Sequence, residues 1–526
     1  MWHVFDIDIV QSSEWNAFVG AFTSGIFLHQ GLFKHGEWHL YGFEIIVAYF
    51  ISLVSVMVLS IRLPGMIGGI SPTPGLVIRL GLYHFAGIFT SLTTYRVFLH
   101  PLEHFPGPFL ARFSSLYKMH LSWNLKLFEE TKRLHCQYGD IIRLGPCELS
   151  IANPAAIKAI HWPQTAVRKG PIYDQTRPRV NLENTRDPIE HARLRKIWDR
   201  AFNTKALRDY SPRTFNITQW FNYYSFDVMG DLAFGKSFEM LQGGTDHYIL
   251  STSHQSMEAA GYLGTVSWSF PLVMRIPGLN RGPQHFWNFI SDQVRSRMEN
   301  PPDLPDIFHW LLQGYTDRTN TAERMAALES EAELAVIAGS DTTSATLANA
   351  TFELLSHPEN VDKLRAEFDD MDLAKLPHLN AVINEILRLH PPVPSGLPRQ
   401  TPLEGLTIDE TYIPGNMNIQ IPFHTVFRDK RCFKRPQEFL PERWTSQLEL
   451  IHDASAFIPF SIGTYSCVGK QLALMEVRWV LTMIITQYDM KFAPEYDVQE
   501  FCEGEIDGFT SISGPLFVQL SRRGIA

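Results

Sequence analysis

The sequence predicts a mainly α-helical protein with minor β-structure, in which one large helical body follows an apolar N-terminal segment. Three observations lead to this fold class. Apolar residues recur at helical spacing through most of the chain beyond residue 110. The β-like runs between these segments are short, and no repeat at a solenoid period occurs. Charged residues, 19% of the chain, are most depleted in the first hundred residues.

The composition excludes several classes of protein. The 526 residues carry a formal charge of −9 and show no basic stripe, which argues against nucleic-acid binding. A hydrophobic content of 45% excludes a disordered or fibrous chain. Five scattered cysteines form neither a zinc-binding spacing nor an evident disulfide framework.

Residues 1–99 are expected to anchor the chain in a membrane through one to three spans. Residues 17–33 carry no charged side chain, residues 40–60 carry one, and residues 76–95 are interrupted by Arg79. About 20 apolar residues cross a hydrocarbon core of ~30 Å. Buried core helices are the alternative, but three such runs are unusual in a soluble domain. The acidic N-terminus argues against a cleaved signal peptide, and the flanking basic residues are too few to fix the orientation.

A proline-rich hinge at residues 100–110 is expected to separate this anchor from the body. Pro101, Pro106 and Pro108 forbid a continuing helix and stiffen the chain. Residues 111–526 have the composition of a soluble protein. We expect them to form one large domain, although their number exceeds the usual ~150 per domain.

Helices and short strands are expected in a fixed order along the body. The helical segments are 112–138, 189–202, 213–234, 284–299, 321–356, 360–370, 378–390 and 468–487. The β-like runs are 140–145, 148–152, 407–422 and 517–521.

The longest predicted helix, 321–356, has both end signals. Asn320 and Glu323 form a capping-box pattern, and His357-Pro358 ends the helix. Its centre reads AVIAGSDTTSATLA, where Gly339 and two threonines weaken the helix. This weakening suggests that another group lies against the helix; a merely tolerated glycine is the alternative.

One cysteine, Cys467, stands where a thiolate could bind a metal. It lies in the glycine-containing loop FIPFSIGTYSCVG, directly before an amphipathic helical segment. Loop N–H groups and the positive end of that helix stabilise a thiolate. No ligand cluster close to it in the sequence completes the shell of a bare metal ion, so the site favours one axial bond to a metal that another ligand set already holds. Haem meets this requirement.

The loop Phe460-x-x-Gly463-x-x-x-Cys467-x-Gly469 resembles the haem-binding loop of the cytochrome P-450 superfamily, the haem-thiolate monooxygenases. The resemblance implies haem b as the cofactor, with Cys467 as the axial ligand of its iron. One position departs from the family's pattern, because Tyr465 stands where arginine or histidine is usual. A charge contact with a haem propionate is then lost or replaced by a phenol hydrogen bond.

The central helical segment also matches the family. The run from Ala338 to Thr343, AGSDTT, resembles the oxygen-activating groove of the family's long central helix. The resemblance implies that Thr342 positions a proton donor at the site of oxygen activation and that Asp341 relays protons to it.

Charged residues complete the set of family motifs, which covers about residues 100–520. Glu385-x-x-Arg388 is nearly worthless alone, because such pairs are common on helices. With Arg443 of a Pro-Glu-Arg-Trp run, it resembles the buried ion-pair triad behind the haem. The expected propionate contacts are His191, Arg195 and Arg399.

The resemblance implies oxidation of a hydrophobic small molecule by O₂ with electrons from NADPH. The sequence has no GxGxxG fingerprint after a strand, so the electrons are expected from a separate NADPH-cytochrome reductase, with cytochrome b5 as a second donor. We expect the endoplasmic reticulum membrane as the location, with the body in the cytosol. Candidate basic contacts for the reductase are Lys196, Arg200, Lys205, Lys470 and Arg478.

Two other functions stay open at this point. One is a haem-thiolate isomerase or dehydratase that does not activate O₂, and the other is a non-enzymatic membrane protein that binds haem. The Asp341-Thr342 pair argues against both, because neither needs proton delivery to oxygen. The expected substrate-contacting segments are mainly apolar, and the hinge and anchor resemble those of fungal secondary-metabolism enzymes acting on terpenoid or prenylated-indole skeletons.

Overall fold

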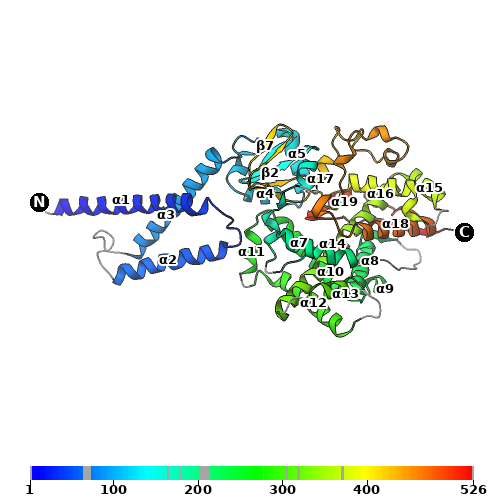
Figure 1. Ribbon diagram of the computed structural model, residues 1–526, viewed down its shortest axis with the longest axis horizontal. Coiled ribbons are helices and arrows are strands. Elements are labelled where there is room, and N and C mark those ends of the chain that lie inside the picture. The colour runs from blue at the N-terminus through cyan, green and yellow to red at the C-terminus, as the bar shows by residue number, and fades with distance from the viewer. Residues whose placement is uncertain are drawn as a thin grey trace.

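The computed structural model describes residues 3–62, 73–162, 165–177, 179–201, 214–276, 278–301, 306–316, 320–368 and 372–523. Three N-terminal helices project from a helical body that contains small sheets (Figure 1). The predicted fold class, mainly α with minor β, is confirmed.

The elements follow one another in this order. The projecting helices are α1 (His3–Leu28), α2 (Gly42–Arg62) and α3 (Pro74–Thr94). The helices of the body are α4 (Leu116–Leu121), α5 (Leu127–Tyr138), α6 (Ala156–His161), α7 (Pro188–Ala201), α8 (Ile217–Phe234), α9 (Met240–Gly243), α10 (Tyr248–Leu263), α11 (Ser269–Met274), α12 (Arg281–Glu299), α13 (Ile307–Gly314), α14 (Thr321–Ser356), α15 (Pro358–Glu367), α16 (Pro377–Leu389), α17 (Phe423–Val426), α18 (Lys470–Gln487) and α19 (Gln499–Gly504). The strands are β1 (Ile141–Gly145), β2 (Glu148–Ile151), β3 (Arg168–Lys169), β4 (Thr214–Asn216), β5 (Arg399–Gln400), β6 (Leu406–Ile408), β7 (Thr411–Ile413), β8 (Asn418–Gln420), β9 (Tyr488–Phe492), β10 (Ile506–Gly508), β11 (Thr510–Ile512) and β12 (Phe517–Arg522).

The apolar front end forms helices of membrane-spanning length. Within the described residues, two stretches are long and apolar enough to cross a bilayer, Gly42–Leu59 in α2 and Pro74–Leu99, which comprises α3 and the π-helical turn after it. None of the α2 stretch is buried against the rest of the protein. The composition of this region therefore supports membrane anchoring.

The proline-rich segment after α3 packs on the body. The π-helical turn Tyr95–Leu99 ends at His100, and the chain then runs along β1. Leu102 and Phe105 are buried, and the Arg143 N–H donates to the Pro106 carbonyl oxygen over 2.7 Å. Gly107 has a φ of 151°, and a Cβ there would lie 2.4 Å from the Arg143 carbonyl oxygen. The segment is thus stiffened both by proline and by its contacts with the sheet.

The sheet that borders the site is mixed. Its strands lie in the order β1-β2-β8-β5-β3, with β2 and β8 parallel and the other pairs antiparallel. In β3 and β5, Lys169 pairs with Arg399, which brings two cations into adjacent strands.

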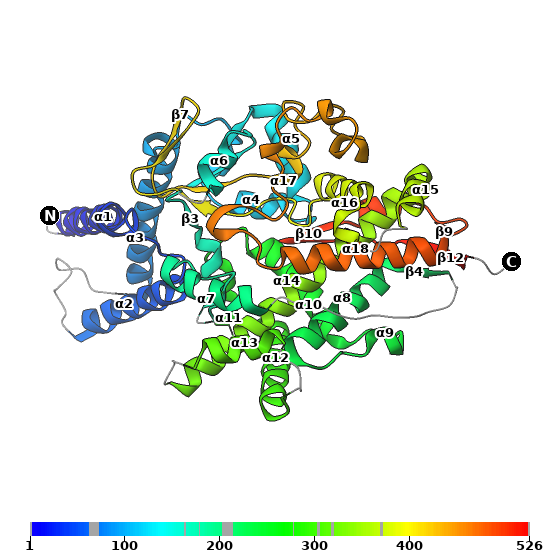
Figure 2. The ribbon, with the colours of Figure 1, turned by 45° about the vertical axis from the view of Figure 1, so that its right-hand side comes forward.

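Helix α14 runs through the middle of the body, between the β-rich part with β2 and β7 and the helices α10, α12 and α13 (Figures 1 and 2). Its first half packs in one apolar core with α8 and α12, and its second half in another core with α16 and α18. The predicted bounds and N-cap are confirmed, since the Asn320 side chain accepts from the N–H groups of Ala322 and Glu323.

Three predicted elements are wrong in detail. The expected helix 213–234 begins only at Ile217, because residues 214–216 form β4 and pair with β12. The expected helix 112–138 is interrupted between α4 and α5, where Leu125 adopts a φ of 53° that a helix cannot contain. The expected run 407–422 is three short strands, because Asp409 and Asn416 turn the chain at φ values of 49° and 57°. Both breaks depend on positive φ at residues other than glycine, which the apolar pattern does not show.

Candidate active site

The Cys467 loop forms one wall of an internal cavity of about 300 Å³. The Cys467 N–H donates to the Phe460 carbonyl oxygen over 2.8 Å, and Gly463 turns the loop with a φ of 74°. Phe460, Cys467 and Gly469 all line the cavity. The loop therefore presents the thiol to the cavity.

The electrostatic surroundings of Cys467 include several features that favour a thiolate. Burial raises the pKa of the thiol, whereas the N–H groups of Gly469 and Lys470 and the charge of Arg195 lower it. These N–H groups belong to the start of α18, whose positive end faces the sulfur. A cation bound to the sulfur would overcome the remaining burial penalty, which suits a metal ligand.

Helix α14 forms the opposite wall. Ala338, Gly339 and Thr342 line the cavity. The Thr342 hydroxyl donates to the Ala338 carbonyl oxygen over 2.8 Å and so loosens this turn without breaking the helix. A Cβ on Gly339 would lie 2.4 Å from the Met229 sulfur, so a larger residue would require the Met229 side chain of α8 to move.

Asp341 faces away from the cavity toward α10. It is buried, and its Oδ1 lies 3.4 Å from His254 Nε2 in an ion pair. Burial opposes protonation of His254, but Asp341, Glu258 and Asp246 together raise its pKa above the ordinary value. Asp341 and Thr342 are thus neighbours in sequence that face different surroundings. Asp341 faces His254, and Thr342 faces the cavity.

The end of the cavity beside β3 and β5 is cationic. Arg195, Arg399 and Lys169 line it, and Lys169 is 4% exposed. The Arg195 Nη1 donates to the Ser466 carbonyl oxygen over 2.6 Å, next to Cys467. The Arg399 Nε is buried without a hydrogen-bond acceptor. His191 also lines this end, and burial together with the three cations lowers its pKa to about 3, so the ring is neutral.

Tyr465 lies among these groups. Its ring is 5.2 Å from the Lys169 ammonium and 5.2 Å from the Arg399 guanidinium. The His191 ring contacts it edge-on, with 4.7 Å between centroids. The aromatic ring separates two cations that would otherwise repel each other, and cation–π attraction stabilises the arrangement.

The charge of the cavity lining fits a flat dianionic group. Lys169, Arg195 and Arg399 stand against the carboxyl of Glu183, and burial raises the pKa of that carboxyl above its ordinary value, so basic side chains outnumber acidic ones at this end. Glu476 also lines the cavity, but burial raises its pKa to about 8 and keeps it protonated at neutral pH. Haem has two propionates and a flat ring, so its edge matches this end and its ring matches the space between α14 and the Cys467 loop.

The predicted triad forms outside this cavity. Glu385, Arg388 and Arg443 are fully buried. Glu385 accepts from Arg388 Nη2 over 2.8 Å and from Arg443 Nε over 2.9 Å. The remaining N–H groups of both arginines donate to backbone carbonyl oxygens of residues 427–450, the segment that leads to the Cys467 loop. The triad thus fixes the path of that segment.

The structure adds residues that the sequence analysis missed. Lys169 and Glu183 line the cavity, and His254 contacts Asp341. Nothing in the sequence distinguishes a buried lysine in the run RKGP from an exposed one. Of the basic residues considered for a reductase contact, Lys205 lies outside the described residues, as do the side chains of Lys196 and Arg200; the Arg478 Nε donates to Asn380 Oδ1 over 2.9 Å.

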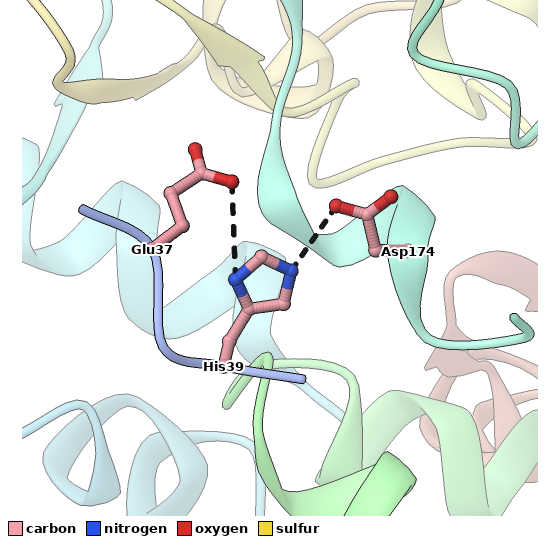
Figure 3. A group of neighbouring side chains, drawn as sticks. All are labelled: Glu37, His39 and Asp174. Atoms are coloured by element: carbon pink, nitrogen blue, oxygen red, sulfur yellow. Dashed lines mark hydrogen bonds and ion pairs between the residues drawn. The ribbon is translucent and has the colours of Figure 1, made fainter. Parts of the chain in front are cut away.

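A second polar cluster lies outside the cavity. The ligand atoms of Glu37, His39 and Asp174 are all within 4.8 Å of one another (Figure 3). Arg186 pairs with Glu37 and Asp174, and Arg177 pairs with Asp174 over 2.8 Å. Because guanidinium groups already neutralise both carboxylates, the cluster is an ion-pair network and not a metal centre.

Known proteins are similar in sequence to the body and, in several cases, to almost the whole chain. A sequence model of the family described as Cytochrome P450 matches residues 166–520. Cytochrome P450 monooxygenase FCK2 of Fusarium pseudograminearum is 41% identical over 95% of this chain and 97% of its own. Cytochrome P450 monooxygenase orf5 of Eupenicillium brefeldianum is 42% identical over 87% of this chain and 98% of its own. Tryprostatin B 6-hydroxylase of Aspergillus fumigatus is 36% identical over 95% of both chains. The chain therefore belongs to the cytochrome P450 family.

Proposed function

We propose that this chain, a cytochrome P450 monooxygenase by family, oxidises a hydrophobic secondary metabolite with O₂ and two electrons from NADPH, which reach it through a separate reductase. The observation that carries this proposal is the cavity itself, which joins one thiol, one helix with a cavity-facing hydroxyl and a cluster of three basic side chains.

Each part of the cavity has its own task. Haem, when bound, would supply the oxygen chemistry, and Cys467 Sγ would hold its iron. Lys169, Arg195 and Arg399 would hold the propionates. The Tyr465 ring keeps two of these cations apart and takes the place of the missing arginine or histidine.

Protons enter from the α10 side. His254 Nε2 and Asp341 Oδ1 lie 3.4 Å apart as an ion pair without a direct hydrogen bond, so they exchange a proton only when this contact shortens. Thr342, one residue further along α14, exposes its hydroxyl to the cavity, where it donates to Ala338 unless it turns toward a bound water. Proton delivery thus requires the Thr342 hydroxyl to move, while Asp341 stays in place.

The substrate side of the cavity is apolar. Its walls are formed by Met229, Leu334, Val393, Leu397 and Phe509. This lining excludes water and favours a carbon skeleton with few polar groups, such as a terpenoid or a prenylated indole. The relative named tryprostatin B 6-hydroxylase supports hydroxylation as the reaction.

The electron donor is an NADPH-cytochrome reductase, with cytochrome b5 as an alternative donor. Lys470, at the start of α18 beside the Cys467 loop, is exposed and is a candidate contact for an acidic partner. We place the anchor in the endoplasmic reticulum membrane and the body in the cytosol, where such a reductase delivers its electrons.

A reconstituted assay with reductase, NADPH and candidate terpenoid and indole scaffolds tests this function. We expect NADPH consumption that depends on substrate, with one oxygen atom from ¹⁸O₂ in the product. Thr342→Val is expected to release more of the electrons as hydrogen peroxide. The matched control is Thr351→Val, because Thr351 makes the same kind of bond, to Leu347, without lining the cavity.

Two outcomes would contradict the proposal. Product formation without O₂ or NADPH would identify an isomerase or dehydratase. A normal haem spectrum with no NADPH turnover for any scaffold would leave the proposed oxidation without support.

A further inference from the structure

We propose that the N-terminal segment crosses the membrane three times, so that the α1–α2 connection lies on the same face as the catalytic body and is clamped to it. The first turn of α1, the last turn of α2 and the first turn of α3 then face the opposite side. This inference rests on membrane anchoring alone and does not depend on the proposed reaction.

The hairpin of α2 and α3 provides two crossings. Helix α2 has 21 residues, about 31 Å at 1.5 Å per residue, which matches a hydrocarbon core of ~30 Å. Its first turn is tied to the body, since Arg275 pairs with Glu44 over 2.8 Å. The far end of α3 returns to the body, where Arg96 Nη1 donates to the Phe113 carbonyl oxygen over 2.7 Å. Because the start of α2 and the end of the α3 segment both lie at the body, the hairpin crosses the membrane away from the body in α2 and back toward it in α3.

Helix α1 provides the third crossing, although it is less apolar than α2. Residues 15–33 carry no charged side chain and span about 28 Å, with Glu14 and Lys34 at the two ends. Residue numbers increase in the same direction along both helices at their contacts, from Phe18 with Tyr83 to His29 with Ser91. The two helices are therefore parallel. Because α3 crosses the bilayer toward the body, α1 crosses in the same direction.

Two polar side chains, one on α1 and one on the π-helical turn after it, bond to α3, as a membrane interior favours. Ser24 Oγ lies 2.8 Å from His84 Nδ1, and Gln30 donates to Ser91 over 2.9 Å. The two backbones approach closely at glycines. A Cβ on Gly25 would lie 2.1 Å from the His84 carbonyl oxygen, and one on Gly87 would lie 2.0 Å from that of Phe22. Small residues at a helix crossing are typical of pairs that associate in lipid.

The clamp consists of Glu37 and His39 on the α1–α2 connection and Asp174 and Arg186 on the body (Figure 3 shows the first three). His39 Nε2 lies 3.1 Å from Asp174 Oδ2, and Arg186 Nη1 donates to Glu37 Oε2 over 2.8 Å. Gln400 Nε2 donates to Glu37 Oε1 over 2.8 Å. The connection is thus bonded to Gln400 of β5, and the neighbouring residue of that strand, Arg399, lines the cavity.

The clamp also reaches the cationic end of the cavity through the backbone. Arg186 Nε donates to the carbonyl oxygen of Lys169 over 3.1 Å, and Asp174 directly follows Tyr173, which accepts from Arg399 Nη1 over 3.3 Å. The anchor therefore fixes the tilt of the body on the membrane through the same strands that position the cofactor-binding cations.

Protease protection in sealed microsomes tests the topology. Four versions of the full chain carry one short epitope tag each: ahead of α1, just before Thr73, after the exposed Gly36, and at the C-terminus. We expect the first two tags to survive external protease until detergent is added, and the last two to be cleaved without detergent. Any other partition of the four tags overturns the three-crossing arrangement.

Hydrogen exchange of residues 34–41 in the full chain, reconstituted in lipid nanodiscs, tests the clamp. Asp174→Ala and, from the anchor side, Glu37→Gln are each expected to raise exchange on the order of tenfold. The matched control is Asp140→Ala, which removes an ion pair with Arg431 elsewhere on the body. Exchange no faster than in this control would overturn the clamp, whatever the tags show.

Discussion

Replacing Lys169 by methionine removes one of the three cations at the cationic end of the cavity while keeping the length of the side chain. Lys169 is 4% exposed, and burial lowers its pKa to about 7 although the Glu183 carboxylate counteracts this shift. A bound dianion favours the charged ammonium, so the variant loses one positive charge and leaves Glu183 facing the propionates. We expect weaker haem binding as a result.

The size of the effect follows from the type of contact. A hydrogen bond to a charged group contributes about 1.5–3 kcal/mol, and 1.4 kcal/mol is tenfold in an equilibrium constant, so haem affinity should fall roughly 10- to 150-fold. Lys169→Arg keeps the charge and should retain most of the affinity. The control is Lys118→Met, because Lys118 is buried to a similar degree and pairs with Glu148, but does not line the cavity.

Tyr465 provides a second test of the same reasoning. In the native protein, Tyr465→Arg would place a third guanidinium against Lys169 and Arg399, and the repulsion should cancel any gain. In the Lys169→Met background the same change supplies the missing charge and should restore haem binding. The two substitutions are therefore expected to be strongly non-additive.

Transfer of haem to excess apomyoglobin, followed by the Soret spectrum, measures these affinities without any turnover. Thermal unfolding of the haem-free proteins separates loss of haem from loss of folding. The reasoning would be refuted if Lys169→Met retained haem as the native protein does, or if Tyr465→Arg changed haem binding equally in both backgrounds.

Three further predictions concern other parts of the site. Cys467→Ser should abolish the carbon-monoxide band typical of thiolate-ligated haem; a persisting band would mean that another group binds the iron. Glu385→Gln leaves two buried arginines without their carboxylate and should cost about 3–5 kcal/mol of folding stability, seen in thermal unfolding. The exposed Glu438→Gln should leave the unfolding midpoint unchanged. The pKa of His254 is raised by Asp341, so their ion pair is fully present below pH 6.5 and is lost as pH rises through the raised value. His254→Gln should therefore remove the pH dependence of peroxide release above pH 6.5. An unchanged pH profile in this variant would exclude a role for the ion pair.

Local sequence patterns were sufficient where local physics decides the structure. Helix α14 begins and ends where the cap of Asn320 and the turn at His357-Pro358 place it, because both signals act within one helical turn. The Cys467 loop was recognisable because the thiol, the glycine turns and the following helix are contiguous. The break between α4 and α5 was missed, since a positive φ at Leu125 is imposed by packing and not by the residue itself.

The sequence by itself therefore determined the helical class, the apolar front end, the thiolate candidate and the family. Only the tertiary structure decided which charges meet. Lys169, Arg195 and Arg399 come from three segments, and their convergence on one cavity depends on strand pairing and helix packing over more than two hundred residues. The same holds for Glu37 and His39, which face Asp174 and Arg186 across 135 residues or more. Charge complementarity at such distances leaves no periodic trace in a sequence, because each partner looks like any polar residue until the fold brings them together.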